Sequence, residues 1–267
     1  MSEEILVNVT PRETRVAVVE NGMLQELHIE RGWRRGVVGN IYKGKVQRVM
    51  PGMQAAFVEV GLDRAAFLHA SDVVRAASAG NGDDIDLPTP APASTPIVEL
   101  LRDGQDIVVQ VVKDPIGSKG ARLTTQISIP SRYMVLLPQS KVIGVSARIE
   151  DETERQRLKT LVGELAATHG GHGYIVRTNA EGQSPEALAE DIAYLARVWA
   201  LVEQRSRESA VGACIYEDLT LPLRAVRDLM RRDVEKVKVD SRETCDRLQT
   251  FAAKYRPGLA ERNEHDA

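Results

Sequence analysis

Two aromatic rings with cations around them stand out in the stretch from residue 38 to residue 68. Phe57 and Phe67 are two of only three phenylalanines in the chain. Aromatic planes flanked by positive charge let the bases of single-stranded nucleic acid stack while the phosphates are neutralised. The same rings could instead form the core of a small β-barrel. The neighbouring cations are Lys43, Lys45, Arg48 and Arg64.

Three consecutive strands between residues 38 and 69 would position these rings. Pro51-Gly52 and Gly61-Leu62-Asp63 break the stretch, and such residues favour tight turns. Side chains of a strand alternate between its two faces. Phe57 and Phe67 are therefore predicted to share one face, opposite the aliphatic series Ala56, Val58, Val60, Ala66 and Leu68.

Two further strands, residues 107–112 and 121–129, complete the five strands of an OB barrel. Before them, residues 76–96 have an Ala-, Ser-, Gly- and Pro-rich composition that predicts a flexible loop. The turn at residues 115–120 would carry cations to one rim, where they could contact phosphates. A solvated hairpin tip is the alternative for each of them. These cations are Lys113, Lys119 and Arg122.

Composition limits where a nucleic-acid site could lie. The chain has 267 residues, 35 of them basic and 38 acidic, for a net charge of -3. A nucleic-acid site must therefore be a local patch. The length predicts more than one domain, and 43% hydrophobic residues are typical of a soluble globular protein. Five scattered histidines show no metal-ligand spacing.

The location of the protein is predicted from what its sequence lacks. The longest apolar runs are too short for a membrane span, and the N-terminus has no signal-peptide core. Cys214 and Cys245 form no CxxC motif. We therefore expect a cytoplasmic protein without a disulfide.

The N-terminal region predicts three antiparallel strands, at residues 5–9, 15–19 and 23–29. Asn21-Gly22 is a strong hairpin signal between the last two. Three such strands opening an α/β domain are similar to the RNase H-like fold. Catalysis in that fold needs an acid on the first strand to help hold a metal. Asn8 stands in this strand, so we expect a structural, non-catalytic domain.

The middle region predicts a small α/β subdomain. Residues 133–137 form a buried-strand run, and residues 151–165 have helical periodicity. A short strand at residues 174–176 ends in Arg177-Thr178, where a guanidinium and a hydroxyl could converge on one anion. The alternative is a surface arginine that pairs with Glu181 or caps a carbonyl. Ser184-Pro185 predicts the start of a long helix.

The last region predicts a helix, a strand and a second helix. The first helix covers residues 223–232 and has a basic face. Residues 234–239 alternate valine with charged residues, which predicts an edge strand, and Ser241 would cap the second helix. This region could complete the domain begun by residues 1–30, with the barrel and the middle subdomain inserted in it. The basic face consists of Arg224, Arg227 and Arg231.

Several runs of the sequence resemble the bacterial ribonuclease E/G family, and its ribonuclease G branch most. The match spans nearly the whole chain except residues 76–96 and the last few residues, and it is highly specific. The runs are Val7-Asn-Val-Thr-Pro11, Asn40-Ile-Tyr-Lys-Gly44, Pro51-Gly-Met-Gln-Ala-Ala-Phe-Val58, Ala65-Ala-Phe-Leu-His-Ala-Ser-Asp72, Val111-Val-Lys-Asp-Pro115, Lys119-Gly-Ala-Arg-Leu-Thr-Thr125, Arg177-Thr178 and Arg224-Ala-Val-Arg-Asp228.

The resemblance implies a multidomain α+β and α/β fold. In it an RNase H-like domain, residues 1–37 and 219–267, is interrupted by an S1 domain and a 5′-sensor subdomain. The S1 domain, an OB barrel, would take residues 38–127, and the sensor residues 128–218. A DNase I-like subdomain would follow in the family, and this chain ends at Ala267 before it.

The resemblance also implies the RNA-contacting residues. The S1 contacts would be Phe57, Phe67 and Lys119, with Lys43, Arg64 and Arg122 as further cations. The pocket for a 5′-phosphate would be lined by Val135, Arg177 and Thr178, together with Ser131 and Arg148. The ribonuclease E pattern has Gly at position 131 and a second Arg at position 147, where this chain has Ser131 and Ala147.

The implied activity is endonucleolytic cleavage of single-stranded, AU-rich RNA with a 5′-monophosphate, in rRNA maturation and mRNA turnover. Two Asp of the DNase I-like subdomain hold Mg²⁺ for cleavage in the family. We therefore expect no catalytic residue, metal ligand or cofactor in this chain, and Mg²⁺ and a homodimer for the full-length enzyme. The chain alone would bind RNA without cutting it. The alternative is a freestanding S1-type RNA-binding regulator.

Overall fold

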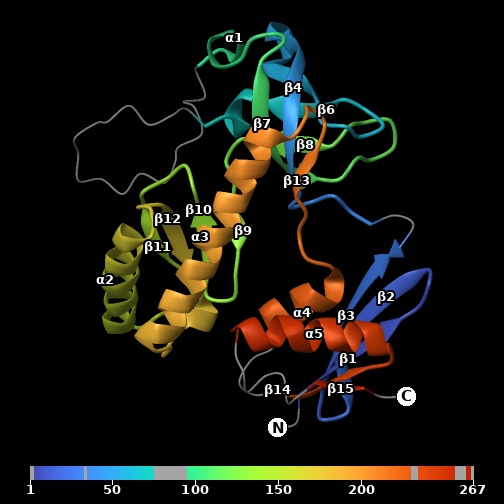
Figure 1. Ribbon diagram of the computed structural model, residues 1–267, viewed down its shortest axis with the longest axis vertical. Helices are drawn as coiled ribbons and strands as arrows, with labels where there is room; N and C mark the ends of the chain where they lie inside the picture. Colours follow the sequence, from blue (N-terminus) through green and yellow to red (C-terminus); the bar gives the residue numbers. More distant parts are fainter. Residues whose placement is uncertain (1–2, 33–34, 75–94, 230–233, 256–262, 266–267) are drawn as a thin grey trace. The chain divides into compact units, whose positions relative to one another are not determined.

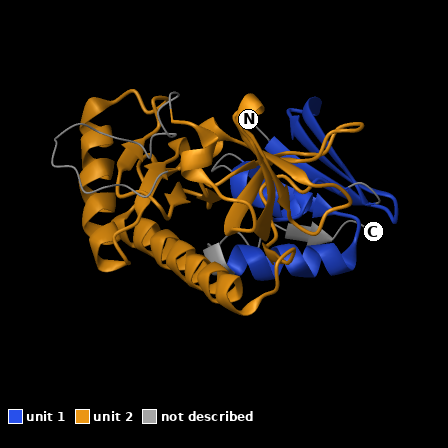
Figure 2. Cartoon of the chain, turned by 90° about the horizontal axis from the view of Figure 1, so that it is seen from above, with its two compact units in different colours: residues 1–36, 219–267 blue, residues 37–218 orange. Residues whose placement is uncertain are grey.

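The computed structural model describes residues 3–32, 35–74, 95–229, 234–255 and 263–265. The chain divides into two units, coloured separately in Figure 2. Unit 1 comprises residues 1–36 and 219–267, and unit 2 comprises residues 37–218. The two ends of the chain therefore fold together, and unit 2 is inserted between them.

Unit 1 contains a five-stranded mixed sheet in the order β15-β14-β1-β2-β3. The strands β1 (Glu3–Val9), β2 (Glu13–Glu20) and β3 (Met23–Arg31) are antiparallel, as predicted. Asn21 and Gly22 have φ angles of 50° and 80°, which the tight hairpin between β2 and β3 requires. The strands β14 (Val234–Val239) and β15 (Asn263–His265) continue the sheet in parallel.

The prediction that residues 234–239 form an edge strand is wrong. Strand β14 lies between β1 and β15, so both of its edges are paired. Its alternation has another cause, because Val234, Val237 and Val239 are buried beneath helices while the charged residues face away. Alternation reports which faces of a strand are covered, and does not report its place in the sheet.

Helices α4 (Leu221–Leu229) and α5 (Arg242–Tyr255) cover one face of this sheet (Figure 1). Ser241 caps α5 as predicted, with its hydroxyl accepting from the Thr244 N–H at 3.3 Å. The predicted basic face of α4 is not a solvated face. Arg227 is buried and bonded to Asp228, and Arg224 is bonded to Glu30. Arg231 lies outside the described residues.

Unit 2 begins with a closed five-stranded β-barrel. Its strands are β4 (Ile41–Met50), β5 (Ala55–Glu59), β6 (Ala66–His69), β7 (Asp106–Lys113) and β8 (Arg122–Thr124). They pair in the order β4-β5-β6-β8-β7, and a pairing of β4 with β7 closes the barrel. This architecture is consistent with the predicted S1 or OB type. Short helices η2 (Pro51–Met53), η3 (Ala70–Asp72) and α1 (Ile97–Leu100) lie in the connections.

The barrel differs from the sequence-based prediction at its ends. The strand predicted at residues 121–129 stops at Thr124, and Ile129 and Pro130 form β9 of another sheet. Strand β13 (Cys214–Tyr216), from far along the chain, pairs with β4 (Figure 1). The sequence-based prediction did not include β13, because three residues are too few for a periodic signal. The predicted loop at 76–96 lies outside the described residues up to 94.

The remainder of unit 2 is a four-stranded sheet with two long helices. The sheet order is β11 (Ile143–Val145), β12 (Gly173–Val176), β10 (Met134–Leu137) and β9 (Ile129–Pro130).

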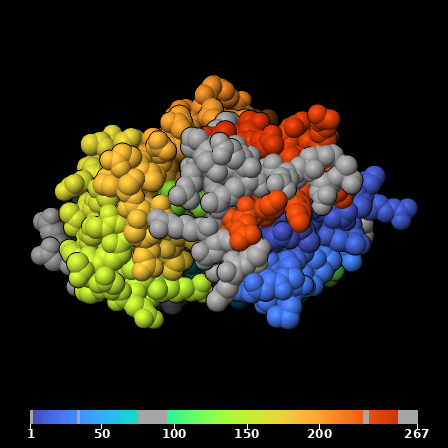
Figure 3. Space-filling view, turned by 90° about the horizontal axis from the view of Figure 1, so that it is seen from below, coloured from blue at the N-terminus to red at the C-terminus, as the bar shows by residue number. Residues whose placement is uncertain are grey.

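Two predicted helices stand beside this sheet. Helix α2 (Glu152–Thr168) begins after Asp151, whose carboxylate accepts from the Thr153 N–H at 2.9 Å. Helix α3 (Pro185–Glu208) begins after Ser184, whose hydroxyl accepts from the Ala187 N–H at 3.3 Å, as predicted. The two helices adjoin one another on the surface, yellow-green and gold in Figure 3. Between β12 and α3 lies η4 (Thr178–Ala180).

Candidate nucleic-acid interface

Phe57 and Phe67 stand directly opposite one another on neighbouring barrel strands. They are a register pair of β5 and β6, and their ring centroids are 6.2 Å apart with the planes at 70°. The aliphatic series on the other face, including Val58 and Leu68, is fully buried. Both phenylalanines remain partly exposed. The barrel core is therefore closed without them, and their rings are available on its outer face.

Cations extend this pair into a row across four strands. Arg48 of β4 is the register partner of Phe57, and Arg122 of β8 is the register partner of Phe67. Directly paired residues point to the same face of a sheet. The order across the barrel is therefore Arg48, Phe57, Phe67 and Arg122. We call these four residues the aromatic row.

Arg122 is held in place by an acid. Its guanidinium lies 2.9 Å from Asp72 Oδ2 through both Nε and Nη2. Fixing one side of the guanidinium lowers the entropy lost when a further anion binds. Its side chain is still 42% exposed, so a phosphate can approach it.

The other predicted cations are placed differently. Lys43 donates to the Ser209 carbonyl at 2.9 Å, so its charge is committed to an internal bond. Arg64 donates to the Gly117 carbonyl at 2.5 Å and thereby holds the turn that carries Lys119. Lys119 is exposed at that turn, where its backbone is bridged to Ile116. Lys43 thus differs from Arg122 and Lys119, which can reach a ligand.

His69 adds a third ring, which the sequence-based prediction left out of the site. It stacks on Phe67 with the ring centroids 6.4 Å apart and the planes at 30°. Its Nδ1 accepts from the Ser71 N–H at 3.2 Å, so we assign the ring proton of neutral His69 to Nε2. The signal was present, because His69 is two residues from Phe67 on the same strand face.

Arg177 is anchored at the end of β12 by two bonds. Its N–H donates to the Tyr133 carbonyl at 2.8 Å, and its guanidinium donates to the Ser131 carbonyl at 2.7 Å. Thr178 follows it at the start of η4. Val135 is the register partner of Ile175, two residues before Arg177, so these side chains share the outer face of the sheet. Val135 and Arg177 therefore lie on the same face, and Thr178 adjoins Arg177 in the chain.

Ser131 and Arg148 occupy different positions relative to this group. The Ser131 side chain is fully buried, and its hydroxyl donates to Asp191 Oδ2. Ser131 thus reaches the outer face only through the carbonyl bonded to Arg177. Arg148 is exposed on the segment after β11. That segment runs beside β12, because the Ser146 N–H donates to the Val176 carbonyl at 2.9 Å.

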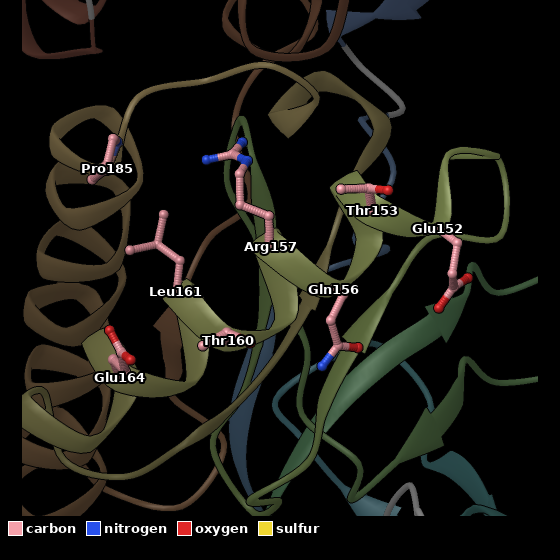
Figure 4. Close-up of a pocket in the computed structure, with 8 residues that line it drawn as sticks. All are labelled: Glu152, Thr153, Gln156, Arg157, Thr160, Leu161, Glu164 and Pro185. Atoms are coloured by element: carbon pink, nitrogen blue, oxygen red, sulfur yellow. The ribbon is translucent and has the colours of Figure 1, made fainter.

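An open groove between α2 and the start of α3 contains none of the predicted site residues (Figure 4). Arg157, which points into it, chelates Glu154 through two bonds of 2.7 Å. The Arg157 bonds, with a further one from the Gly182 N–H, lower the pKa of Glu154 to about 2. The ion pair lies within α2, and the Gly182 N–H bond joins it to the turn before α3. The groove is lined by Glu152, Thr153, Gln156, Arg157, Thr160, Leu161, Glu164 and Pro185.

The described residues of unit 1 include no set that fits a catalytic metal. Asn8 on β1 donates to Asp240, and the same carboxylate accepts from the Val9 N–H at 2.8 Å. Across the described ranges, no three His, Cys, Asp or Glu side chains gather as metal ligands. We therefore derive no step through a metal for these residues. None of the described helices is long and apolar enough to span a membrane.

Comparisons with known proteins give consistent similarities. The model of the ribonuclease E/G family matches residues 128–266. Ribonuclease G of Salmonella typhimurium is 52% identical over 265 residues, which are 99% of this chain and 53% of that protein. Ribonuclease G of Escherichia coli K12 is 51% identical with the same coverage. Ribonuclease E of Nostoc sp. is 35% identical over 91% of this chain and 33% of its own length. The chain thus spans about half the length of the ribonuclease G relatives it matches.

Proposed function

The chain belongs to the ribonuclease E/G family, and on that premise we propose that it is the RNA-binding and 5′-end-sensing portion of a ribonuclease G. The observation that carries this proposal is the aromatic row, with two partly exposed rings between two arginines on one face of a closed barrel. Stacking is tolerant of sequence and contributes about 1–3 kcal/mol per base. Such a row suits single-stranded RNA, whose unstacked bases are accessible.

Binding on the row would combine stacking with charge. Bases would lie on Phe57 and Phe67, and His69 would extend the surface along β6. The arginines at the two ends of the row, with Lys119 at the rim, would contact phosphates of the same strand. Because the net charge of the chain is -3, this local group of cations would have to provide the attraction.

We assign the remaining parts of the chain by the same premise. Residues 38–127 are the S1 domain and residues 128–218 the 5′ sensor, while 1–37 and 219–267 form an RNase H-like domain. Support for the last comes from the sheet, in which three antiparallel strands are followed by two parallel ones, with helices on one face. The bonding of Asp240 to Asn8 and a backbone N–H suits a structural role for this domain.

The 5′ sensor would bind a terminal phosphate beside Arg177. One N–H of the guanidinium donates to the Ser131 carbonyl, and a guanidinium presents paired donors that match phosphate oxygens. The Thr178 hydroxyl would add a neutral donor, and Val135 would form an apolar wall. Arg148 is exposed on the neighbouring segment and could add charge.

The whole enzyme would cleave RNA for rRNA maturation and mRNA turnover, as a cytoplasmic homodimer. Mg²⁺ would be held by aspartates of a DNase I-like part and would activate water and stabilise the leaving oxygen. Both cysteines of this chain are free, which suits a reducing compartment.

Binding and cleavage by residues 1–267 test this function directly. A fluorescent, single-stranded, AU-rich oligonucleotide should bind, and a duplex of the same sequence should compete poorly. The chain purified with Mg²⁺ should leave the oligonucleotide intact. Absence of binding would refute the proposal for the barrel. Cleavage that EDTA abolishes and that survives repeated purification would show that these residues hold a catalytic centre after all.

A further inference from the structure

Asp191 of α3 is a charged group in the core beneath the proposed sensor. Only 4% of it is exposed. Helix α3 runs beside β9 and β10 (Figure 1), and Asp191 meets the chain between those two strands. Burying a carboxylate is costly unless hydrogen bonds and opposite charge compensate it. The groups to which Asp191 is hydrogen-bonded therefore indicate its function.

One carboxylate oxygen holds two points of that connecting segment. Asp191 Oδ2 accepts from the Ser131 hydroxyl at 2.5 Å and from the Tyr133 N–H at 3.1 Å. The segment is also closed on itself, because the Ser131 N–H donates to the Met134 carbonyl at 2.8 Å. The Asp191 carboxylate thus fixes the path of residues 131–133.

Ser131 and Tyr133 also hold Arg177, through their carbonyl oxygens. The carbonyl of Ser131 accepts from the Arg177 guanidinium at 2.7 Å, and the carbonyl of Tyr133 accepts from its N–H at 2.8 Å. Each of Ser131 and Tyr133 therefore donates inward to Asp191 and accepts outward from Arg177. Any shift of this segment therefore moves the attachment point of the guanidinium and that of the Arg177 backbone.

Opposing effects act on the ionisation of the Asp191 carboxyl. Burial raises the pKa of the Asp191 carboxyl to about 6, and the bonds from Ser131 and Tyr133 and the nearby charges of Arg132 and Arg177 oppose that shift. The geometry requires Asp191 Oδ2 to accept from both donors, which the ionised carboxylate can do.

We propose that Asp191 is a positioning residue of the 5′-end sensor: through Ser131 and Tyr133 it sets the guanidinium of Arg177 for a terminal phosphate. This inference rests on the proposed function. It predicts that loss of the Asp191 charge lowers discrimination between RNA ends, while general affinity for RNA, which the aromatic row provides, is unchanged.

The test compares one short oligonucleotide with a 5′-monophosphate or a 5′-hydroxyl, titrated against the 267-residue chain and its variants. The ratio of the two Kd values is the readout. Asp191→Asn should lower that ratio about threefold to tenfold, the change expected for one hydrogen bond, and should leave the Kd for the 5′-hydroxyl form unchanged. Asp191→Asn combined with Arg177→Ala should match Arg177→Ala alone, because the effect passes through Arg177.

Folding is controlled by thermal melts and by a second pair of variants. Ser131→Ala removes one of the two bonds to Asp191 and keeps the carboxylate. Ser140→Ala is its matched control, since Ser140 is also a buried serine of this subdomain, and its hydroxyl accepts from the Val142 N–H. Ser131→Ala should lower the end preference and Ser140→Ala should not. If Asp191→Asn fails to fold, the comparison of Ser131→Ala with Ser140→Ala tests the inference in its place.

Three results would overturn the inference, and they differ in what else they overturn. A wild-type chain with equal affinity for both ends removes the sensor itself, and Asp191 with it. A wild-type chain that prefers the monophosphate, with variants that keep the same ratio, retains the sensor and reduces Asp191 to an anchor of α3. An equal loss of affinity for both ends would likewise mean a purely structural role.

Discussion

Arg122 lies beside Phe67 in the register of β8 and β6, with its guanidinium held by Asp72 at 2.9 Å. A fixed cation next to an exposed ring is a place where one nucleotide can stack and be neutralised at once. The two residues are 55 positions apart in sequence, and the barrel brings them together. The contribution of the ring and the contribution of the cation can therefore be tested by separate substitutions.

The aromatic contribution is tested by Phe67→Ala. The substitution should weaken binding of single-stranded RNA about tenfold, since stacking contributes about 1–3 kcal/mol per base, with little change in the melting temperature. Phe251→Ala is the contrasting variant, because Phe251 packs against the core of unit 1. It should lower stability and spare RNA affinity. If Phe67→Ala unfolds at a much lower temperature than wild type, Phe67 is a residue of the barrel core and not a stacking surface.

The charged contribution is tested by Arg122→Ala against Lys43→Ala. Removal of one phosphate contact should weaken binding and make the slope of log K against log salt shallower by about 0.7. Lys43→Ala should leave that slope unchanged, because the Lys43 ammonium is bonded to the Ser209 carbonyl. Titrations at several salt concentrations provide the measurement. Equal slopes for wild type and Arg122→Ala would exclude Arg122 from phosphate contact.

His69 is tested by separating its ring from its polar edge. His69→Phe keeps a ring for stacking and removes the Nε2 donor, whereas His69→Ala removes both. We expect His69→Ala to weaken RNA binding about threefold to tenfold, towards the lower end of the stacking range, and His69→Phe to restore most of that loss. A variant His28→Ala, in unit 1, should bind like wild type. If His69→Ala also binds like wild type, His69 does not belong to the RNA-binding surface.

The end preference is tested by Arg177→Ala. Charged hydrogen bonds contribute about 1.5–3 kcal/mol, so the wild-type chain should favour a 5′-monophosphate over a 5′-hydroxyl by about tenfold. Arg177→Ala should abolish most of this ratio. Arg155→Ala is a control, since Arg155 is held by the carbonyls of Ser146 and Ile149. A ratio that persists in Arg177→Ala would mean that another group senses the end.

The ion pair at the groove predicts a pH dependence of stability. Arg157 and the Gly182 N–H lower the pKa of Glu154 from 4.5 to about 2. The folded state therefore binds this proton more weakly than the unfolded state, so the stabilisation is complete above about pH 5 and is lost as pH falls towards 2. Glu154→Gln should cost about 1 kcal/mol at pH 7. Urea melts should show that this difference from wild type shrinks by pH 3; a constant difference would refute it.

The sequence by itself determined what depends on neighbours along the chain. Alternation placed Phe57 and Phe67 opposite the aliphatic series, because a strand has only two faces. Asn21-Gly22 determined a hairpin, and Ser184-Pro185 and Ser241 determined helix starts, because those signals act within a few residues. The type of these elements could be predicted from the sequence, although the strand predicted at residues 121–129 extends five residues beyond the end of β8.

Only the tertiary structure decided which distant residues meet. It set the register that places Arg48 and Arg122 beside the two rings, and it bonded Lys43 inward to Ser209. It paired β13 with β4 and placed β14 inside its sheet. It also placed Asp191 beneath the segment that holds Arg177. Pairing between strands and burial of a charge depend on groups many residues apart, and no local pattern in a single sequence encodes those distances.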